Sequence, residues 1–180
     1  MKGFILTTLA AVLLVGCSGE LTGAVYYSTK GGDVKRLGDH EIVLVAATEA
    51  FEKEWQEARE AYVVAMEPKM AAAEQARKEA AASSGYQEHL FDKAKEAAGE
   101  ADKVRSEHLA HALKLVAWGK TASARTDVNG KYSVNVPRGR YYVYGRHNGA
   151  INDMTWFVTV AVGGTTTLDL TGSNASGWPF

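Results

Sequence analysis

Two histidines one helical turn apart are the first residues whose spacing could support chemistry. His108 and His111 stand beside Glu107 in a helix-forming segment, so both imidazoles lie near one face and could share a metal ion. A zinc site uses three or four ligands, however, and two histidines do not complete one. His108 also lies on the apolar stripe of its segment. We therefore predict that His108 makes an interhelical contact and is satisfied by a hydrogen bond, and we assign no metal and no cofactor.

The segment from Asp127 to Gly130 has the residue types that begin a calcium-binding loop. It lacks the later acidic ligand that completes an EF-hand loop, so we predict a hairpin turn instead. Serine, histidine and aspartate residues all occur in the chain, but no Gly-x-Ser-x-Gly motif or comparable setting accompanies them. We therefore do not expect an enzyme.

A row of aromatic residues is the candidate ligand-binding site. Side chains alternate between the two faces of a strand, so the predicted strand at 141–147 places Tyr142 and Tyr144 on the face opposite the core. Either Trp156 or Phe157 of the next strand would extend this row. Outward aromatic rings of this kind could bind a carbohydrate or peptidoglycan.

The charge balance and the cysteine count narrow the class of protein. The 180 residues include 20 Lys and Arg and 21 Asp and Glu, for a formal net charge of −1. This balance does not resemble that of nucleic-acid-binding proteins. The single cysteine permits neither an intramolecular disulfide nor a cysteine metal cluster, so the fold depends on packing.

The single cysteine, Cys17, follows a segment typical of an export signal. Lys2 provides a positive start, and the apolar run at 4–15 is too short for a permanent membrane span. Residues 14–17, Leu-Val-Gly-Cys, resemble the lipobox of bacterial lipoproteins, in which the signal peptide is removed and the cysteine thiol takes a diacylglycerol. The resemblance implies that residues 1–16 are a signal peptide and that Cys17 is the lipidation site.

The residue after the cysteine bears on where the protein is sorted. Ser18 stands where an inner-membrane retention signal usually has aspartate, and this resembles the outer-membrane pattern. We therefore expect a lipid-anchored protein of the cell envelope, on the outer membrane and facing the periplasm.

Two parts of the sequence have a β-strand pattern. Short runs of β-branched and aromatic residues, bounded by Gly, Pro or Asn, predict about seven strands. These cover residues 20–26, 41–47, 121–126, 131–136, 141–147, 154–162 and 165–171. Short strands with frequent turns favour an antiparallel β-sandwich. The alternating apolar positions predict a core that contains Tyr132, Val134, Val136, Val158, Val160, Leu168 and Leu170.

The alanine- and charge-rich middle, at 48–117, predicts an inserted helical hairpin. Apolar residues recur there at spacings of three and four in two stretches, separated by a Ser/Gly turn at 83–85. Ser84 and Gln87 have the spacing of a capping box that would begin the second helix. Each arm would be about 50 Å long and would extend beyond a small sandwich. Pro68 predicts a kink or a break in the first arm.

The β pattern also resembles a known family. Residues 126–141 resemble the signature of carboxypeptidase-regulatory-like domains, which are small prealbumin-like (transthyretin-like) sandwiches of exported bacterial proteins. Residues 23–25, 158–160 and 168–170 are similar to the first and last strands of that family. The resemblance implies an accessory sandwich without shared catalytic residues. This chain departs from the pattern through its helical insertion.

We therefore predict an α+β fold in which residues 17–47 and 118–180 form the sandwich and 48–117 form the inserted hairpin. The predicted function is that of a membrane-anchored, non-catalytic envelope lipoprotein acting as a protein-interaction or structural module through its hairpin. Its predicted partners are the membrane, through Cys17, and an envelope protein, with no nucleic acid. The alternative function is carbohydrate or peptidoglycan binding by outward aromatics of the sandwich, such as Tyr142, Tyr144 and Trp156.

Overall fold

The computed structural model describes residues 18–83, 87–149 and 153–176. The predicted lipidation site Cys17 and the predicted capping residue Ser84 lie outside these ranges. Among the described residues, no helix has the length and apolar character needed to cross a membrane.

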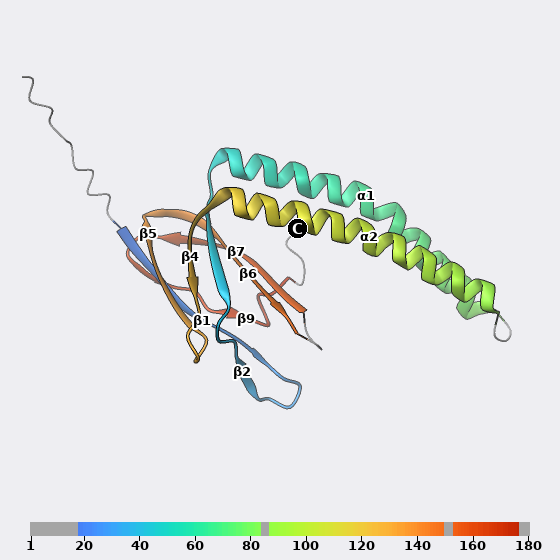
Figure 1. Cartoon of the computed structure of the whole chain (residues 1–180), viewed down its shortest axis with the longest axis horizontal. Helices are drawn as coiled ribbons and strands as arrows, with labels where there is room; N and C mark the ends of the chain where they lie inside the picture. Colours follow the sequence, from blue (N-terminus) through green and yellow to red (C-terminus); the bar gives the residue numbers. More distant parts are fainter. Residues whose placement is uncertain (1–17, 84–86, 150–152, 177–180) are drawn as a thin grey trace, which may run out of the picture.

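Two β-sheets packed face to face form the body of the protein (Figure 1). The first sheet contains β1 (Ser18–Ser28), β2 (Val34–Arg36), β5 (Lys131–Pro137), β8 (Thr165–Thr167) and β9 (Leu170–Thr171). The second has the order β4 (Lys120–Arg125), β3 (Glu41–Ala46), β6 (Gly139–Asn148) and β7 (Asp153–Val162). All the predicted strands are confirmed, although the last divides into β8 and β9. The sequence did not predict β2.

The strand pairing differs from the expected antiparallel pattern at one place. β1 pairs antiparallel with β2 and β5, but β8 and β9 run parallel to it. The chain from β8 to β9 passes very close to β1 at Gly23. A Cβ atom at Gly23 would lie 1.8 Å from the carbonyl oxygen of Leu168, so only glycine fits there.

The space between the two sheets is filled by the main apolar core. Of the predicted core residues, Tyr132, Val134, Val136 and Leu170 are buried, and Val158, Val160 and Leu168 pack partly buried against them. Trp156 lies fully buried in this core, and its indole N–H donates a hydrogen bond of 2.7 Å to the carbonyl oxygen of Thr171.

Two long helices, α1 (Glu49–Ala82) and α2 (Glu88–Gly119), form the predicted antiparallel hairpin. The Thr48 hydroxyl caps α1 by accepting a hydrogen bond of 3.2 Å from the backbone N–H of Phe51. Of the predicted kink or break, the break is absent, because the helix continues through Pro68. Proline removes the hydrogen bond to the carbonyl four residues earlier. Because Val64 and Pro68 are both exposed, water can satisfy that carbonyl.

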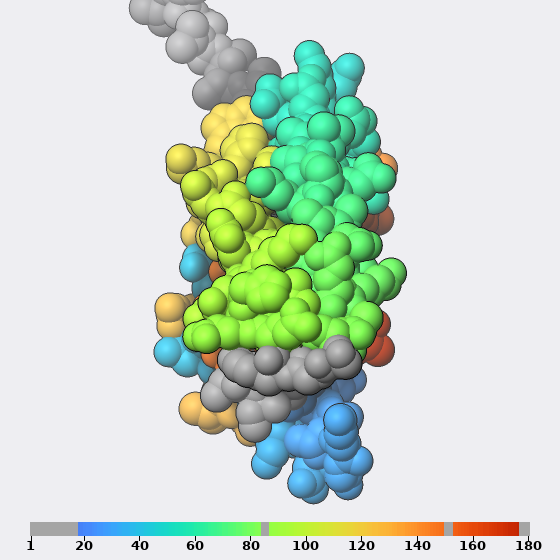
Figure 2. Space-filling model, turned by 90° about the vertical axis from the view of Figure 1, so that its right-hand side faces the viewer, coloured from blue at the N-terminus to red at the C-terminus, as the bar shows by residue number. Residues whose placement is uncertain are grey.

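The hairpin forms a third layer and then extends beyond the sandwich. The halves of the helices nearest the sheets cover the outer face of the four-stranded sheet, and the remaining halves continue past it (Figure 1). Figure 2 views the molecule from the side to which the hairpin points, and the outer halves of both helices stand in front of the sandwich. The protein is therefore an α+β sandwich with a projecting helical hairpin, as the sequence predicted.

A histidine pair that the sequence did not predict joins the β2–β3 loop to β6. The His40 Nδ1 atom lies 2.8 Å from the Gly38 carbonyl oxygen, and its Nε2 atom lies 2.9 Å from Nδ1 of His147. Because a carbonyl oxygen only accepts, Nδ1 of His40 carries the proton. In the neutral pair, His147 Nδ1–H therefore donates to Nε2 of His40.

This pair should make the fold sensitive to acid. Burial, together with the nearby His40, lowers the pKa of His147, and Asp153 opposes the shift. A pKa that is lower in the folded state stabilises the fold above the unfolded value of about 6.5, and this stabilisation is lost as pH falls toward the folded-state pKa. We predict that the urea concentration at the unfolding midpoint decreases when the pH is lowered from about 7.5 to about 5.5. His147→Gln should make this decrease smaller. The exposed His89→Gln is the matched control, and equal pH dependence in both variants would contradict the assignment.

Candidate functional site

A second apolar cluster attaches the base of the hairpin to the outer face of the four-stranded sheet. Its buried members come from both layers: Val43, Val45 and Tyr144 from the sheet, and Phe51, Trp55, Ala58, Ala112, Leu115 and Val116 from the helices. Close approach is possible because residue 119 is glycine, where a Cβ atom would lie 2.7 Å from side-chain atoms of both Phe51 and Val45. The base of the hairpin is therefore an integral layer of the fold.

Stacked aromatic rings form the centre of this cluster. The Trp55 and Phe157 rings are stacked with centroids 4.1 Å apart, and Phe157 stacks on Tyr142 at 4.8 Å. Such pairs contribute roughly 0.5–1.5 kcal/mol beyond the burial of their area. The Tyr142 hydroxyl donates a hydrogen bond of 2.9 Å to Glu52, which also forms an ion pair with Arg140. Burial, followed by the Glu52 carboxylate, raises the pKa of Tyr142.

This arrangement contradicts the predicted exposed row of Tyr142, Tyr144 and Trp156. Tyr144 is only 8% exposed, Tyr142 is half-buried beneath α1, and Trp156 is fully buried. Alternation placed both tyrosines on the correct face, but the helices cover that face. Trp156 lies on the opposite face from Phe157, so it points into the inter-sheet core.

The outer half of the hairpin is held together by small side chains. Its buried residues are Met66, Ala76, Ala80 and Ala101. Alanine buries little apolar area, so this half is held less firmly than the aromatic base. Two ion pairs link the helices, Lys69–Glu100 at 3.2 Å and Lys93–Glu79 at 2.7 Å. Exposed pairs of this kind stabilise a fold only slightly.

Large apolar side chains lie exposed on the same half of the hairpin. They are Met70 and Phe91, and Val63 and Val64 near the middle of α1 are exposed as well. Met70 also lines a groove of about 300 Å³ with Ala73, Ala94 and Ala98, and the ion-paired Glu74 and Arg77 complete its lining. An apolar surface bordered by charges of both signs is suited to contact with another protein.

His108 makes the predicted interhelical contact, but among the described residues its buried Nδ1 atom does not make the hydrogen bond that the prediction included. Its ring meets that of Tyr62 edge-on, with centroids 5.4 Å apart. Its Nδ1 atom is buried and has no hydrogen-bond partner within the described ranges, whereas His111 is exposed. In the part of the chain that the structure describes, no group of three or more His, Cys, Asp or Glu residues could hold a metal ion.

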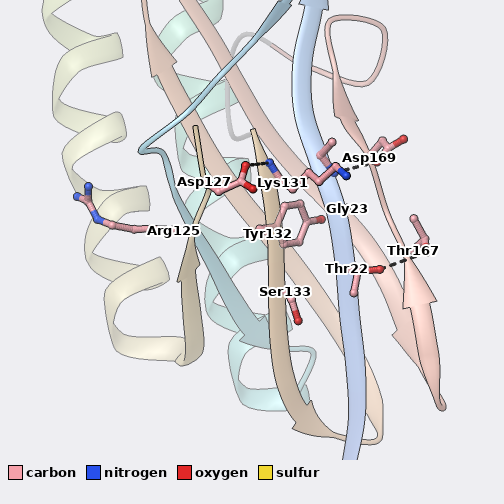
Figure 3. A pocket seen from close by; sticks show the side chains of 10 residues that line it. Thr22, Gly23, Arg125, Asp127, Lys131, Tyr132, Ser133, Thr167 and Asp169 are labelled. Atoms are coloured by element: carbon pink, nitrogen blue, oxygen red, sulfur yellow. Dashed lines mark hydrogen bonds between the residues drawn. The ribbon is translucent and has the colours of Figure 1, made fainter. Parts of the chain in front are cut away.

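A groove of about 520 Å³ lies on the sandwich, where β1, β5 and β8 meet (Figure 3). Polar groups that line it make hydrogen bonds that stabilise the fold. Asp169 accepts a hydrogen bond of 2.8 Å from the backbone N–H of Ala24, and the Tyr132 hydroxyl donates one of 2.6 Å to the Leu168 carbonyl. Burial, followed by the charge of Asp169, raises the pKa of Tyr132. These contacts hold the β8–β9 segment against β1, so we assign no ligand to the groove.

Asp127, at the edge of this groove, forms a turn, but not the hairpin turn that the sequence predicted. Its carboxylate accepts hydrogen bonds from the backbone N–H groups of Asn129 and Lys131, at 2.8 and 2.9 Å. Gly130 has a positive φ of 74°, which glycine adopts readily. The turn connects β4 to β5 and therefore crosses from one sheet to the other, whereas a hairpin turn would join two paired strands.

The aromatic cluster at the base of the hairpin should contribute strongly to the stability of the fold. Trp55→Ala would leave a cavity between α1 and β7, and we expect it to reduce the free energy of unfolding by about 3–5 kcal/mol. Val64→Ala, on the exposed side of the same helix, should change it by less than about 0.5 kcal/mol. Chemical denaturation measures both. Equal, small effects would show that the base of the hairpin is not part of the core.

Comparisons with known proteins give only distant similarities. No protein-family model matches the sequence, and no curated protein matches it significantly. Among solved structures, a proposed carbohydrate-binding protein from Pseudomonas aeruginosa is 15% identical with a TM-score of 0.40, over 86% of this chain and 88% of that one. The pilus backbone protein RrgB from Streptococcus pneumoniae is 10% identical with a TM-score of 0.27, over 84% of this chain and 40% of its own. At these scores, neither protein's role is carried over to this chain.

Proposed function

We propose that this chain is a non-catalytic lipoprotein of the bacterial cell envelope that binds a protein partner through its helical hairpin. A lipid on Cys17 would hold it on the outer membrane, facing the periplasm. The observation that carries the proposal is the outer half of the hairpin, which extends beyond the sheet and exposes large apolar side chains.

The lipid anchor is supported by the sequence around Cys17. An apolar leader ends in Leu-Val-Gly-Cys, which resembles the lipobox of bacterial lipoproteins. Each buried CH₂ of an acyl chain contributes about 0.8 kcal/mol to membrane affinity, so a multiply acylated Cys17 would be sufficient to hold the protein.

The partner contact is supported by the energetics of the hairpin. Ordering each residue costs about 1–2 kcal/mol of backbone entropy, and the alanine-rich outer half recovers little of this by burial. Val63 and Met70 are two turns apart on one face of α1, which is the spacing that an apolar groove or helix recognises. A partner helix laid along this face would bury them. The outer half therefore suits interaction better than stability.

The alternative of carbohydrate or peptidoglycan binding by aromatics has less support. Tyr142 and Tyr144 lie under the hairpin, and Trp156 is in the core.

The lipid anchor can be tested by Cys17→Ser, which replaces the side-chain sulfur with oxygen. We predict that Cys17→Ser abolishes metabolic labelling by a fatty acid and moves the protein from the membrane to the soluble fraction, because serine has no thiol to take the diacylglycerol. Ser18→Ala, at the neighbouring position, should keep the label. Labelling that persists in Cys17→Ser would rule out this anchor.

The hairpin contact can be tested by position-specific crosslinking in living cells. A photoreactive amino acid at Met70 should give a discrete crosslinked product, whereas the same residue at Lys30, on the β1–β2 turn, should not. Deleting residues 71–95 and restoring a short turn should keep cooperative unfolding of the sandwich and eliminate the product. A product of equal yield from both positions, or from the shortened hairpin, would contradict the proposal.

A further inference from the structure

The first strand begins immediately after the proposed lipidation site. Ser18 pairs with Pro137, and Gly19 pairs with Val136, so β1 is already part of the sheet at its first residue. The backbone N–H of Glu20 also donates a hydrogen bond of 2.9 Å to the Gly164 carbonyl. One peptide unit, about 3.8 Å, therefore separates the Cα atom of Cys17 from a fixed strand. An acylated Cys17 would have no flexible linker.

The same end of the sandwich contains the root of the hairpin. We call this end of the molecule the anchor end. It comprises Ser18, the β5–β6 turn at Arg138, Gly163–Gly164, Thr48 and Trp118–Lys120. Gly139 pairs with Val162, and the backbone N–H of Ala47 donates a hydrogen bond of 2.9 Å to the Arg140 carbonyl. These pairings bring the ends of both sheets and the root of the helices together.

The anchor end exposes side chains that suit a membrane interface. Trp118 is 60% exposed although it is a large aromatic residue, and Arg138 is exposed at its turn. Tryptophan and arginine are favoured at the headgroup level, where one part of the side chain is apolar and another is polar.

The other charges of this end are largely balanced. Lys120 forms an ion pair with Glu41, and Arg140 forms one with Glu52, whereas Arg138 makes no ion pair within the described ranges. Glu49 adds a negative charge at the start of α1. The contact would therefore depend on the acyl chains, Trp118 and Arg138, and only weakly on net charge.

We propose that the anchor end rests directly on the phospholipid headgroups, with Trp118 and Arg138 at the interface. The inference rests on the proposed lipidation of Cys17 and adds an orientation to it. α1 starts and α2 ends at the anchor end, and both helices extend away from it, so their outer ends lie far from the anchor end (Figure 1). Arms of this length place those outer ends about 50 Å from the root. The partner surface of the hairpin is thereby held away from the membrane.

The orientation can be measured on the full, lipidated protein in vesicles of phosphatidylethanolamine and phosphatidylglycerol. Acylation removes the thiol of Cys17, the single native cysteine, so one introduced cysteine can be labelled with a fluorophore. The three variants are Arg138→Cys at the anchor end, Lys30→Cys at the other end of β1, and Glu88→Cys at the start of α2. A lipid with a nitroxide at the headgroup then quenches nearby fluorophores.

We expect severalfold stronger quenching at position 138 than at positions 30 and 88. Similar quenching at all three positions, with Cys17 shown by mass spectrometry to be acylated, would overturn the orientation and leave the lipid anchor intact. Mass spectrometry that shows an unmodified Cys17 would overturn the anchor and, with it, the orientation.

Discussion

The stack of aromatic rings between α1 and β7 is the contact on which the arrangement of the molecule depends. Trp55 on Phe157, at 4.1 Å, joins the hairpin to a sheet whose other face forms the inter-sheet core. The four-stranded sheet is thus covered on both faces. Without the helices, Val43, Val45 and Tyr144 would face water, so the sandwich and the base of the hairpin stabilise each other.

This contact divides the hairpin into two physically different halves. The inner half is fixed by aromatic and branched side chains, whereas the outer half depends on alanine packing and exposed ion pairs. A firmly held base can direct a more weakly stabilised extension, as a rigid scaffold does for a binding loop. The exposed Met70 lies on this extension, and the exposed Val63 lies near the middle of α1, where the extension begins.

The sequence predicted most of the fold because its patterns are local. Strand alternation correctly placed Tyr132, Val134 and Val136 in the core, and the insertion was recognisable by its composition. The site was predicted less well, because covering of a sheet face is a long-range property. Strand alternation alone predicted that Tyr142 and Tyr144 are exposed, but in the folded protein the helices cover them. The pairing of His40 with His147, which are 107 residues apart, likewise depends on the folded topology.

The central claim is that the outer half of the hairpin contacts a partner in the envelope. Hydrogen exchange measured by mass spectrometry, on purified protein and on protein in native envelope vesicles, tests it most directly. We predict that exchange of residues 63–98 becomes slower in the envelope, while exchange of the inter-sheet core stays unchanged. Identical exchange of residues 63–98 in both preparations would contradict the account.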